Sequence, residues 1–311
     1  MTEVSFTALP GGHLTGQLRV PGDKSISHRA VMLGSLAEGV TEVQGFLTGE
    51  DCLATMKAFQ AMGVRIEKTG PTALRITGAG KAGLSAPSSA LDLGNSGTSM
   101  RLMAGLMAAQ KFSSALTGDA SLSRRPMARV VEPLRLMGAS IATTEGQRAP
   151  LKISPVGQLN GIRYQSRVAS AQVKSCLLLA GLYARGMTEV LEPEASRDHT
   201  ERMLAAFGVR IEASAGRAAV QGGQMLTATH IQVPADISSA AFFMVGAAMT
   251  PGCEITLADV GVNPTRTGII DVLRQMGAEI ELLNPREFGA EPVADLRVRG
   301  ARLHGTAIGK D

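Results

Sequence analysis

Apolar and polar positions along the chain follow one pattern four times. Each copy is an amphipathic helical stretch, then Met or Phe, then Gly, and then a short run that alternates like a strand. The four copies are MKAFQAMGVRIE (56–67), VEPLRLMGASIA (131–142), ERMLAAFGVRIE (201–212) and IDVLRQMGAEIE (270–281). Their glycines, Gly63, Gly138, Gly208 and Gly277, are roughly 70 residues apart, which predicts an internal repeat. We expect each glycine to be a left-handed residue between a helix and a strand.

A second and more apolar helix recurs in the same register. Its four copies begin within SISHRAVML, GNSGTSMRLMAGLM, VASAQVKSCLLLAGL and ADISSAAFFMVGAAM. Small and hydroxyl side chains at the front of each copy suit N-caps. The rest is apolar almost all round, so we expect all four helices to be buried. β-like runs such as VTEVQGF, ALRITG, APLKIS and EITLADV lie between the helices, so the fold class is α/β.

The arrangement of these repeats predicts where a ligand binds. If the repeats surround a common axis, the N-termini of their buried helices converge on one face. A helix N-terminus carries about half a positive charge and exposed N–H groups. Several such ends together predict a site for phosphate or carboxylate.

Composition narrows the choice of ligand. The 311 residues are 44% hydrophobic, enough for two ordinary domains. We expect a cytoplasmic protein without membrane contact, because there is no long apolar run and no signal-peptide pattern. The net charge of +4 comes from singly spaced basic residues, and aromatics are only 3%, so nucleic acid is not an expected partner. These features favour a small anion over nucleic acid as the ligand.

The cysteines and histidines give no sign of a metal or a cofactor. Cys52, Cys176 and Cys253 are far apart, so we expect them to be reduced, buried and without a metal role. GAGKAG (78–83) resembles a dinucleotide-binding loop, but no helix pattern follows it. Ser25 and His28 lack an orienting acid for a hydrolase triad.

Cationic side chains recur near the helix starts. In PGDKSISHRA, Pro21 to Asp23 signal a helix start, yet Lys24 and Arg29 follow where Asp or Glu is preferred. The other cations at comparable places are Arg101, Arg124, Arg125, Lys174 and Arg197. Any one of them alone is consistent with a solvated side chain. Their recurrence as a set favours oxyanion binding, for which Arg is suited.

The stretch LGNSGTSMR (93–101) is a further candidate. It places Gly94, Asn95, Ser96 and Gly97 in a turn directly before a helix. Glycines there allow backbone N–H groups to approach a ligand closely. A tight turn with an ordinary cap explains the same pattern.

Together these motifs resemble a known family. PGDKSISHRA, LGNSGTSMR, GDASLSRRPM, SAQVKSCLLLAGL and SRDHTERM, in this order, closely resemble the 5-enolpyruvylshikimate-3-phosphate synthases, and SAQ and SRDH resemble their bacterial class II branch. The resemblance implies the two-lobed enolpyruvyl transferase fold, an inverted α/β barrel of βαβαββ repeats. It implies an upper lobe of three repeats at 21–237 and a partial lower lobe from 1–20 and 238–311. We expect apolar surface on this incomplete lower lobe unless a partner piece covers it.

The resemblance also implies a reaction and a set of site residues. The family transfers the enolpyruvyl group of phosphoenolpyruvate to the 5-hydroxyl of shikimate 3-phosphate and releases phosphate, in the biosynthesis of chorismate and aromatic amino acids. It implies no cofactor and no metal. The substrate-binding residues carried over by motif are Lys24, Ser25, Arg29, Asn95, Gly97, Arg125, Ser170, Ala171, Gln172 and Arg197. Lys24 is also the catalytic candidate, and Gly97 leaves room for glyphosate.

Some family features have no counterpart in this sequence. The family's Asp base, a Glu-bearing segment and two further arginines would lie beyond Asp311, so we expect the chain alone to be inactive. The remaining C-terminal piece of the same enzyme is therefore an expected partner, and the full-length form is expected to be monomeric. Two alternatives stay open. One is a transferase acting on a nucleotide sugar, which should carry a reactive loop Cys, and the other is a non-catalytic phospho-ligand-binding fragment.

Overall fold

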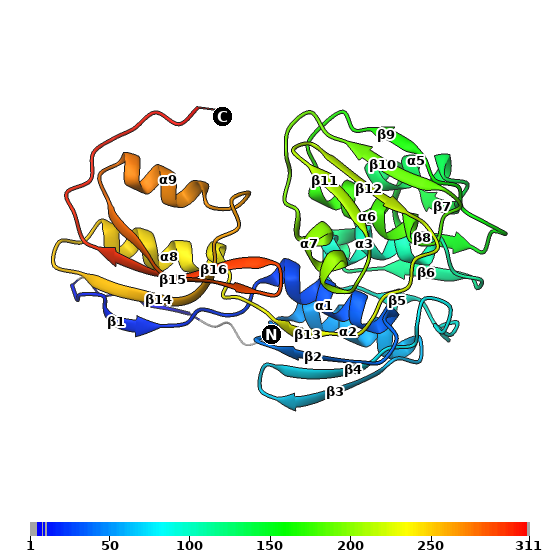
Figure 1. Ribbon diagram of the computed structural model, residues 1–311, viewed down its shortest axis with the longest axis horizontal. Helices are drawn as coiled ribbons and strands as arrows, with labels where there is room; N and C mark the ends of the chain where they lie inside the picture. Colours follow the sequence, from blue (N-terminus) through cyan, green and yellow to red (C-terminus); the bar gives the residue numbers. More distant parts are fainter. Residues whose placement is uncertain (1–4, 8, 10, 310–311) are drawn as a thin grey trace. The chain divides into compact units, whose positions relative to one another are not determined.

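The computed structural model describes residues 5–7, 9 and 11–309, and the chain forms two compact units (Figure 1). Residues 21–234 and 287–292 form the three-repeat unit, and residues 1–20, 235–286 and 293–311 form the single-repeat unit. We expected the three-repeat lobe to end at residue 237, but the boundary lies after Pro234, three residues earlier. Residues 287–292 also belong to the three-repeat unit. In the described part of the chain, no helix combines the length and the apolar character that a membrane span requires.

The three-repeat unit contains three similar sets of helices and strands. The first is α1 (Lys24–Leu36), β2 (Val40–Gln44), α2 (Glu50–Ala61), β3 (Arg65–Gly70) and β4 (Ala73–Thr77). The second is β5 (Leu91–Asp92), α3 (Gly97–Met107), β6 (Ser114–Thr117), α4 (Ala120–Ser123), α5 (Ala128–Leu136), β7 (Ser140–Thr144) and β8 (Arg148–Ser154). The third is β9 (Arg163–Gln165), α6 (Ala171–Gly181), β10 (Met187–Leu191), α7 (His199–Ala206), β11 (Ile211–Ser214) and β12 (Arg217–Gln221), followed by β13 (His230–Gln232).

The fourth repeat supplies most of the single-repeat unit. Its elements are β1 (Thr15–Leu18), α8 (Ile237–Ala248), β14 (Glu254–Gly261), α9 (Gly268–Gln275), β15 (Glu279–Phe288) and β16 (Glu291–Arg299). The tip of the β15–β16 hairpin is the segment 287–292 that clusters with the other unit. All four predicted helix–Gly–strand segments are confirmed.

The four sheets share one topology, which confirms the repeat. Their strand orders are β13-β2-β4-β3, β5-β6-β8-β7, β9-β10-β12-β11 and β1-β14-β16-β15. In each sheet the first strand pairs in parallel with the second, and the other pairs are antiparallel. Two first strands are exchanged between repeats: β1 precedes α1 but pairs with β14, while β13 precedes α8 but pairs with β2.

The glycine of each repeat adopts the predicted left-handed conformation. The φ angles of Gly63, Gly138, Gly208 and Gly277 are +90°, +96°, +82° and +94°. A residue with a Cβ atom is strained at these angles, whereas glycine is not. The same turn therefore joins α2, α5, α7 and α9 to the strands that follow them.

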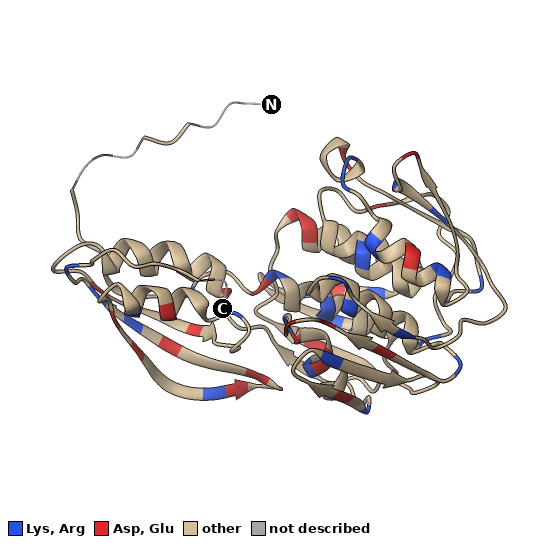
Figure 2. Cartoon of the chain, turned by 90° about the horizontal axis from the view of Figure 1, so that it is seen from above, with Lys and Arg blue, Asp and Glu red and all other residues tan. Residues whose placement is uncertain are grey.

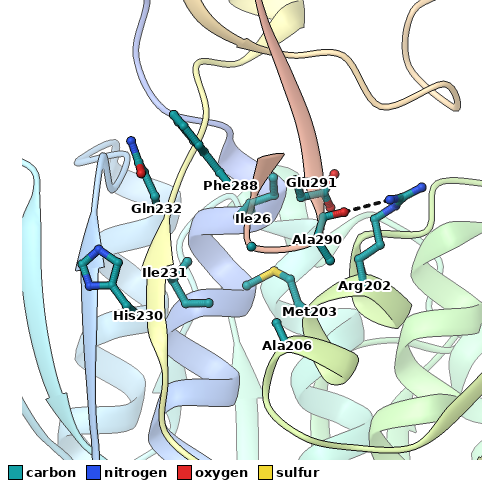
Figure 3. Close-up of a pocket in the computed structure, with 11 residues that line it drawn as sticks. Ile26, Arg202, Met203, Ala206, His230, Ile231, Gln232, Phe288, Ala290 and Glu291 are labelled. Carbon is teal, nitrogen blue, oxygen red and sulfur yellow. Dashed lines mark hydrogen bonds between the residues drawn. The ribbon is translucent and has the colours of Figure 1, made fainter. Parts of the chain in front are cut away.

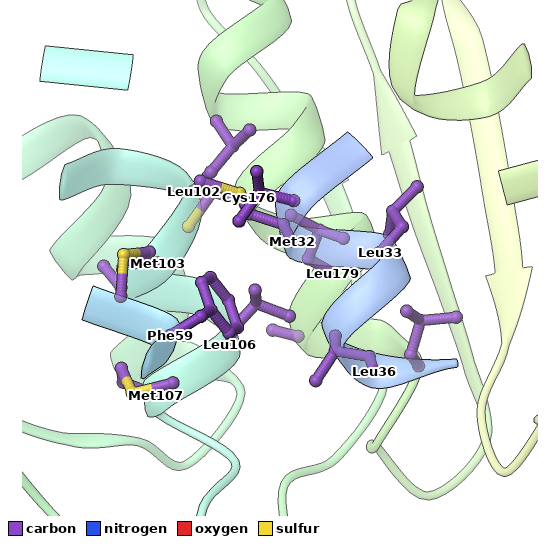
Figure 4. Close-up of a cluster of buried hydrophobic side chains, with 14 of the residues drawn as sticks. Met32, Leu33, Leu36, Phe59, Leu102, Met103, Leu106, Met107, Cys176 and Leu179 are labelled. Carbon is purple, nitrogen blue, oxygen red and sulfur yellow. The ribbon is translucent and has the colours of Figure 1, made fainter. Parts of the chain in front are cut away.

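The core of the three-repeat unit lies around α1, α3 and α6. Figure 4 shows Met32 and Leu33 of α1, Met103 and Leu106 of α3 and Leu179 of α6 in one apolar cluster. A Cβ atom at Gly105 would lie 2.2 Å from the carbonyl oxygen of Cys176, so the glycine lets the backbones of α3 and α6 approach each other closely. The three cysteines are buried and are not joined in disulfides, as predicted.

The prediction that all four apolar helices are buried is wrong for the fourth, α8. Ala240, Met244 and Ala247 are buried against the single-repeat sheet, but Phe242 is 83% exposed and Met249 is 62% exposed. A sheet covers only one side of a helix, and this unit has no neighbouring repeat to cover the other side. The expected apolar surface on this part of the chain is confirmed.

Charged side chains alternate along the single-repeat sheet, where red and blue ribbon segments lie on neighbouring strands (Figure 2). Arg299 pairs with Glu254 and Glu281, and Arg297 also pairs with Glu281. Exposed pairs of this kind contribute only about 0–1 kcal/mol each. They mark the solvated face of the sheet, opposite the core.

Candidate active site

The N-terminal turns of α1, α3 and α6 meet within the three-repeat unit, as predicted. Thr98 of α3 accepts a hydrogen bond of 3.1 Å from the Gln172 amide of α6. His28 Nε2 of α1 lies 3.4 Å from the hydroxyl of Ser96, the N-cap of α3. The positive ends of three helix dipoles are therefore gathered in one place, which favours an anionic ligand.

Each of these helices is capped by a short polar side chain. The Asp23 carboxylate accepts from the Ile26 N–H, and the Ser96 hydroxyl accepts from the Ser99 N–H. The Ser170 hydroxyl accepts from the Val173 N–H at the start of α6. The caps satisfy only part of the free N–H groups at each end, so the remaining donors stay available to a ligand.

Two guanidinium groups lie over the first turn of α3. A Cβ atom at Gly97 would be 2.7 Å from Arg101 Nη1 and 3.0 Å from Arg125 Nη1. Arg101 donates to Gln172 Oε1 at 3.0 Å, and Arg125 donates to Asn95 Oδ1 at 2.5 Å. Asn95, Gly97, Arg125 and Gln172, all predicted site residues, therefore form one cluster.

Electrostatics in this cluster favour an anion between the two arginines. Burial lowers the pKa of Arg101, and the positive charge of Arg125 lowers it further. Without a bound anion, burial and the nearby charge of Arg125 therefore disfavour the charged form of Arg101. A phosphate or carboxylate bound between the guanidinium groups would remove this repulsion and accept bidentate hydrogen bonds.

Lys24 and Ser25 lie at the first turn of α1. The Lys24 side chain is half exposed, and its ammonium is 3.1 Å from Asp51 Oδ2 of α2. The Ser25 carbonyl accepts a hydrogen bond of 2.9 Å from Arg29. Its flexible four-carbon stem and half-exposed ammonium suit a proton donor or an adaptable ligand contact.

Arg29 is more deeply buried than its predicted role as a substrate contact suggested. Its guanidinium donates to the Thr200 hydroxyl at 2.7 Å, the Ser175 hydroxyl at 2.8 Å and the Ser25 carbonyl. Burial lowers its pKa to about 10. In this structure Arg29 joins α1 to α6 and α7, and its contact with a substrate stays a prediction.

The remaining predicted residues lie at the starts of α6 and α7. Ser170 and Ala171 begin α6, where the Ser170 N–H donates to Glu192 Oε1 at 2.6 Å. Arg197 is exposed in the loop before α7, and its charge contributes to the lowered pKa of Arg29. All ten predicted site residues therefore belong to the three-repeat unit. Their ligand contacts stay predictions.

Sequence reasoning missed the acidic partners of the buried cations. Lys174 was grouped with the ligand-binding cations, but its side chain is only 5% exposed and pairs with Glu192 and Glu201. The sequence did indicate that such partners exist, because a lysine inside the apolar run SAQVKSCLLLAGL requires buried partners. Which acids would supply them could not be read from the sequence.

His28 is a structural residue and not part of a hydrolase triad. Its Nδ1 is 2.8 Å from the Thr55 hydroxyl and 3.3 Å from the Ser99 hydroxyl. Burial lowers its pKa to about 3, so the ring is neutral near pH 7. It therefore joins α1, α2 and α3 through hydroxyl groups, behind the first turn of α3.

A pocket beside β13 lies apart from this cluster. Figure 3 shows Ile26, Met203, Ile231 and Phe288 around it, with Arg202 donating to the Ala290 carbonyl at 2.8 Å. Its cavity of about 20 Å³ holds no more than a water molecule. The pocket thus reflects how the 287–292 turn packs on α7, and it is too small for a metabolite.

Comparisons with known proteins agree with this geometry. The profile of the family described as EPSP synthase (3-phosphoshikimate 1-carboxyvinyltransferase) matches residues 9–309. A 3-phosphoshikimate 1-carboxyvinyltransferase of Methylococcus capsulatus is 65% identical over 308 residues, covering 98% of this chain and 70% of the relative. A protein of the same name from Alkalilimnicola ehrlichii is 60% identical and covers 98% of this chain and 68% of the relative.

A solved structure agrees as well. The EPSP synthase from Acinetobacter baumannii superposes with a TM-score of 0.88 at 56% identity, covering 94% of this chain and 66% of that one. The chain thus spans about two thirds of the length of these relatives. The resemblance drawn from the motifs is confirmed, and the chain belongs to the EPSP synthase (3-phosphoshikimate 1-carboxyvinyltransferase) family of enzymes.

Proposed function

We propose that the three-repeat unit is the upper lobe of a 3-phosphoshikimate 1-carboxyvinyltransferase and binds shikimate 3-phosphate and phosphoenolpyruvate. The single-repeat unit is then part of the lower lobe. In the reaction, the methylene carbon of phosphoenolpyruvate is protonated and the 5-hydroxyl of shikimate 3-phosphate attacks C2. The hydroxyl loses its proton as it attacks, and the tetrahedral adduct then loses phosphate together with one proton of the new methyl group, which restores the C=C bond. The protein supplies orientation, proton transfer and fixed positive charge.

The observation that carries the proposal is the pair of guanidinium groups at Gly97. Arg101 and Arg125 both approach the first turn of α3, where free backbone N–H groups also point outward. This combination suits the phosphate or carboxylate of phosphoenolpyruvate. Gln172, bonded to both Arg101 and Thr98, is placed to contact either substrate.

The other predicted residues are assigned to shikimate 3-phosphate. Lys24 and Ser25 at the start of α1, and Ser170 and Ala171 at the start of α6, surround the same group of helix ends. Arg197 supplies an exposed guanidinium for its phosphate. Lys24 is the proposed proton donor, because its ammonium is exposed and its side chain is long enough to follow a reacting group.

Calorimetric titration of the chain tests this assignment. We expect saturable binding of shikimate 3-phosphate, tightened by phosphoenolpyruvate. Arg125→Gln should weaken the phosphoenolpyruvate effect by roughly 10- to 100-fold, since a charge-assisted hydrogen bond contributes about 1.5–3 kcal/mol. Arg210→Gln, at an exposed arginine beyond the C-terminal end of α7, makes the same charge change as a control.

A folded chain that binds neither substrate would overturn the proposal. Phosphate release above background from phosphoenolpyruvate and shikimate 3-phosphate would contradict the expectation that this chain alone is inactive.

A further inference from the structure

A buried network of charges lies behind the starts of α6 and α7. Lys174, on the second turn of α6, has its ammonium 2.8 Å from Glu201 Oε1 and 3.1 Å from Glu192 Oε2. The Ser196 carbonyl lies 3.3 Å away and is its third acceptor. All three N–H groups of the ammonium are therefore used inside the protein, and none is left for a substrate.

Such a network is costly to bury. The side chains of Lys174, Glu192 and Glu201 are 5%, 1% and 5% exposed. Burial raises the pKa of Glu201, although the charge of Lys174 partly opposes this. Apolar side chains of similar volume often serve stability as well as a buried ion pair. The network therefore calls for a reason other than stability.

The hydrogen bonds of Glu192 indicate such a reason, because they attach two separate loops to one carboxylate. Its Oε1 accepts from the Ser170 N–H at 2.6 Å, at the start of α6. Its carboxylate also accepts from the Ser196 hydroxyl, at 2.7 Å to Oε2 and 2.9 Å to Oε1. Ser170 and Arg197, the residue after Ser196, are the proposed contacts of shikimate 3-phosphate from these two loops.

We propose that Glu192, held in place by Lys174, is a positioning residue for shikimate 3-phosphate. It fixes the distance between the Ser170 cap and the Ser196–Arg197 segment without touching the ligand. The Lys174 ammonium, 3.1 Å from Glu192 Oε2, holds the carboxylate where it accepts from both loops. This inference rests on the proposed function, because it assumes that the two loops share one ligand.

Glu201 provides a matched control. It is equally buried and pairs with the same ammonium, but among the described residues it hydrogen-bonds to neither Ser170 nor Ser196. Glu192→Gln and Glu201→Gln each remove one buried negative charge beside Lys174. Only the first places an amide between the two loops.

The experiment compares the two variants in the full chain. Calorimetry with shikimate 3-phosphate should show a loss of affinity of about tenfold or more in Glu192→Gln and less than about threefold in Glu201→Gln, since hydrogen bonds to charged groups are worth more than tenfold. Thermal melting should move by a similar amount in both. Phosphoenolpyruvate affinity, assigned to Arg125, should change little in either, which a general loss of structure would not allow.

Ser196→Ala is a second and milder variant that keeps all three charges. It removes one loop attachment, and we expect a loss of roughly three- to tenfold in shikimate 3-phosphate affinity with a smaller drop in melting temperature than in Glu192→Gln. Equal losses in Glu192→Gln and Glu201→Gln, or unchanged affinity in folded Glu192→Gln or Ser196→Ala, would overturn the inference. Failure of the unmodified chain to bind shikimate 3-phosphate would instead overturn the proposed function.

Discussion

The helices α3 and α8 occupy the same place in two copies of one repeat, yet they have different surroundings. Leu102 of α3 is fully buried, whereas Phe242 of α8 is 83% exposed. Both helices pack on sheets of the same strand order, and both are apolar almost all round. In the three-repeat unit, neighbouring helices cover the side that the sheet leaves open. Burial of this helix is therefore a property of several repeats together, not of one.

The two regions also differ at their polar ends. The first turns of α1, α3 and α6 share hydrogen bonds through His28, Ser96, Thr98 and Gln172. At the start of α8, Arg266 pairs with the N-cap Asp236 of the same unit at 3.1 Å. A site that needs several helix ends is therefore built where three repeats are present, and the comparison can be tested on each unit separately.

The largest expected difference concerns side chains on the two helices. Leu102→Ala should destabilise the three-repeat unit by about 2–5 kcal/mol, because it opens a cavity in a packed core. Phe242→Ala should change the stability of the single-repeat unit by less than about 0.5 kcal/mol. Hydrogen exchange resolved by segment measures each unit on its own. Equal losses would show that α8 is covered as α3 is.

The next difference concerns a glycine in each helix. A Cβ atom at Gly105 would meet the Cys176 carbonyl oxygen at 2.2 Å, whereas one at Gly246 would meet only the end of the Leu14 side chain at 3.2 Å. Gly105→Ala should therefore cost about 1–3 kcal/mol through overpacking. Gly246→Ala should be neutral or slightly stabilising, because Ala favours helix by up to about 1 kcal/mol. Segment-resolved exchange again separates the two results.

Mild acid, between pH 6.5 and 5, should weaken the three-repeat unit more than the single-repeat unit, whose carboxyl groups of lowered pKa, such as Asp295, affect stability only in stronger acid. His28 has a folded-state pKa of about 3 against 6.5 in an unfolded chain, so below pH 6.5 the unfolded state binds a proton that the folded state does not. Stability is then lost as pH falls from 6.5 towards 3, by about 1.4 kcal/mol per pH unit, or about 2 kcal/mol at pH 5.

The histidine variant provides the control for this pH effect. His28→Gln should flatten the pH dependence of denaturant unfolding between pH 6.5 and 5, even if it lowers stability at pH 7. α8 contains no histidine. An unchanged slope in the variant would show that another group is responsible.

Only a small effect on stability is expected at Gly97. A Cβ atom there would meet the ends of the Arg101 and Arg125 side chains, which can move, so Gly97→Ala should cost less than about 1 kcal/mol. The displaced guanidinium groups should nevertheless weaken phosphoenolpyruvate binding by about tenfold, the loss of one charge-assisted contact. Calorimetry combined with thermal melting measures both. A large drop in melting temperature without a change in affinity would contradict the assignment of this turn.

Much of the repeat could be predicted from the sequence because it is encoded locally. The helix–Gly–strand segments depend on hydrophobic spacing and on a glycine such as Gly63 that accepts a left-handed φ. The small, hydroxyl-rich helix starts identified the turns that meet at Thr98 and Gln172. Local signals of this kind do not depend on which repeat packs beside which.

The rest depends on contacts between distant segments. The exposure of Phe242 follows from the number of neighbouring repeats, which hydrophobicity alone does not give. The acids that neutralise Lys174 come from two other elements, 18 and 27 residues further along the chain. Arg29 donates to hydroxyl groups of α6 and α7, which are 146 and 171 residues further along the chain. Sequence patterns indicate that buried charge needs partners, but they do not identify them.

The exchange of β1 and β13 has a consequence for biosynthesis. β1 leaves the ribosome well before its partner strand, because Thr15 pairs with Glu254 of β14. At about 5–20 residues per second, its partner follows roughly 10 to 50 s later. During this interval the sheets that contain β6 and β10 can assemble, while β1 waits as an unpaired strand and the β2 sheet lacks β13 until residues 230–232 are made. A nascent chain should therefore protect α3 from protease well before it protects its own N-terminal segment.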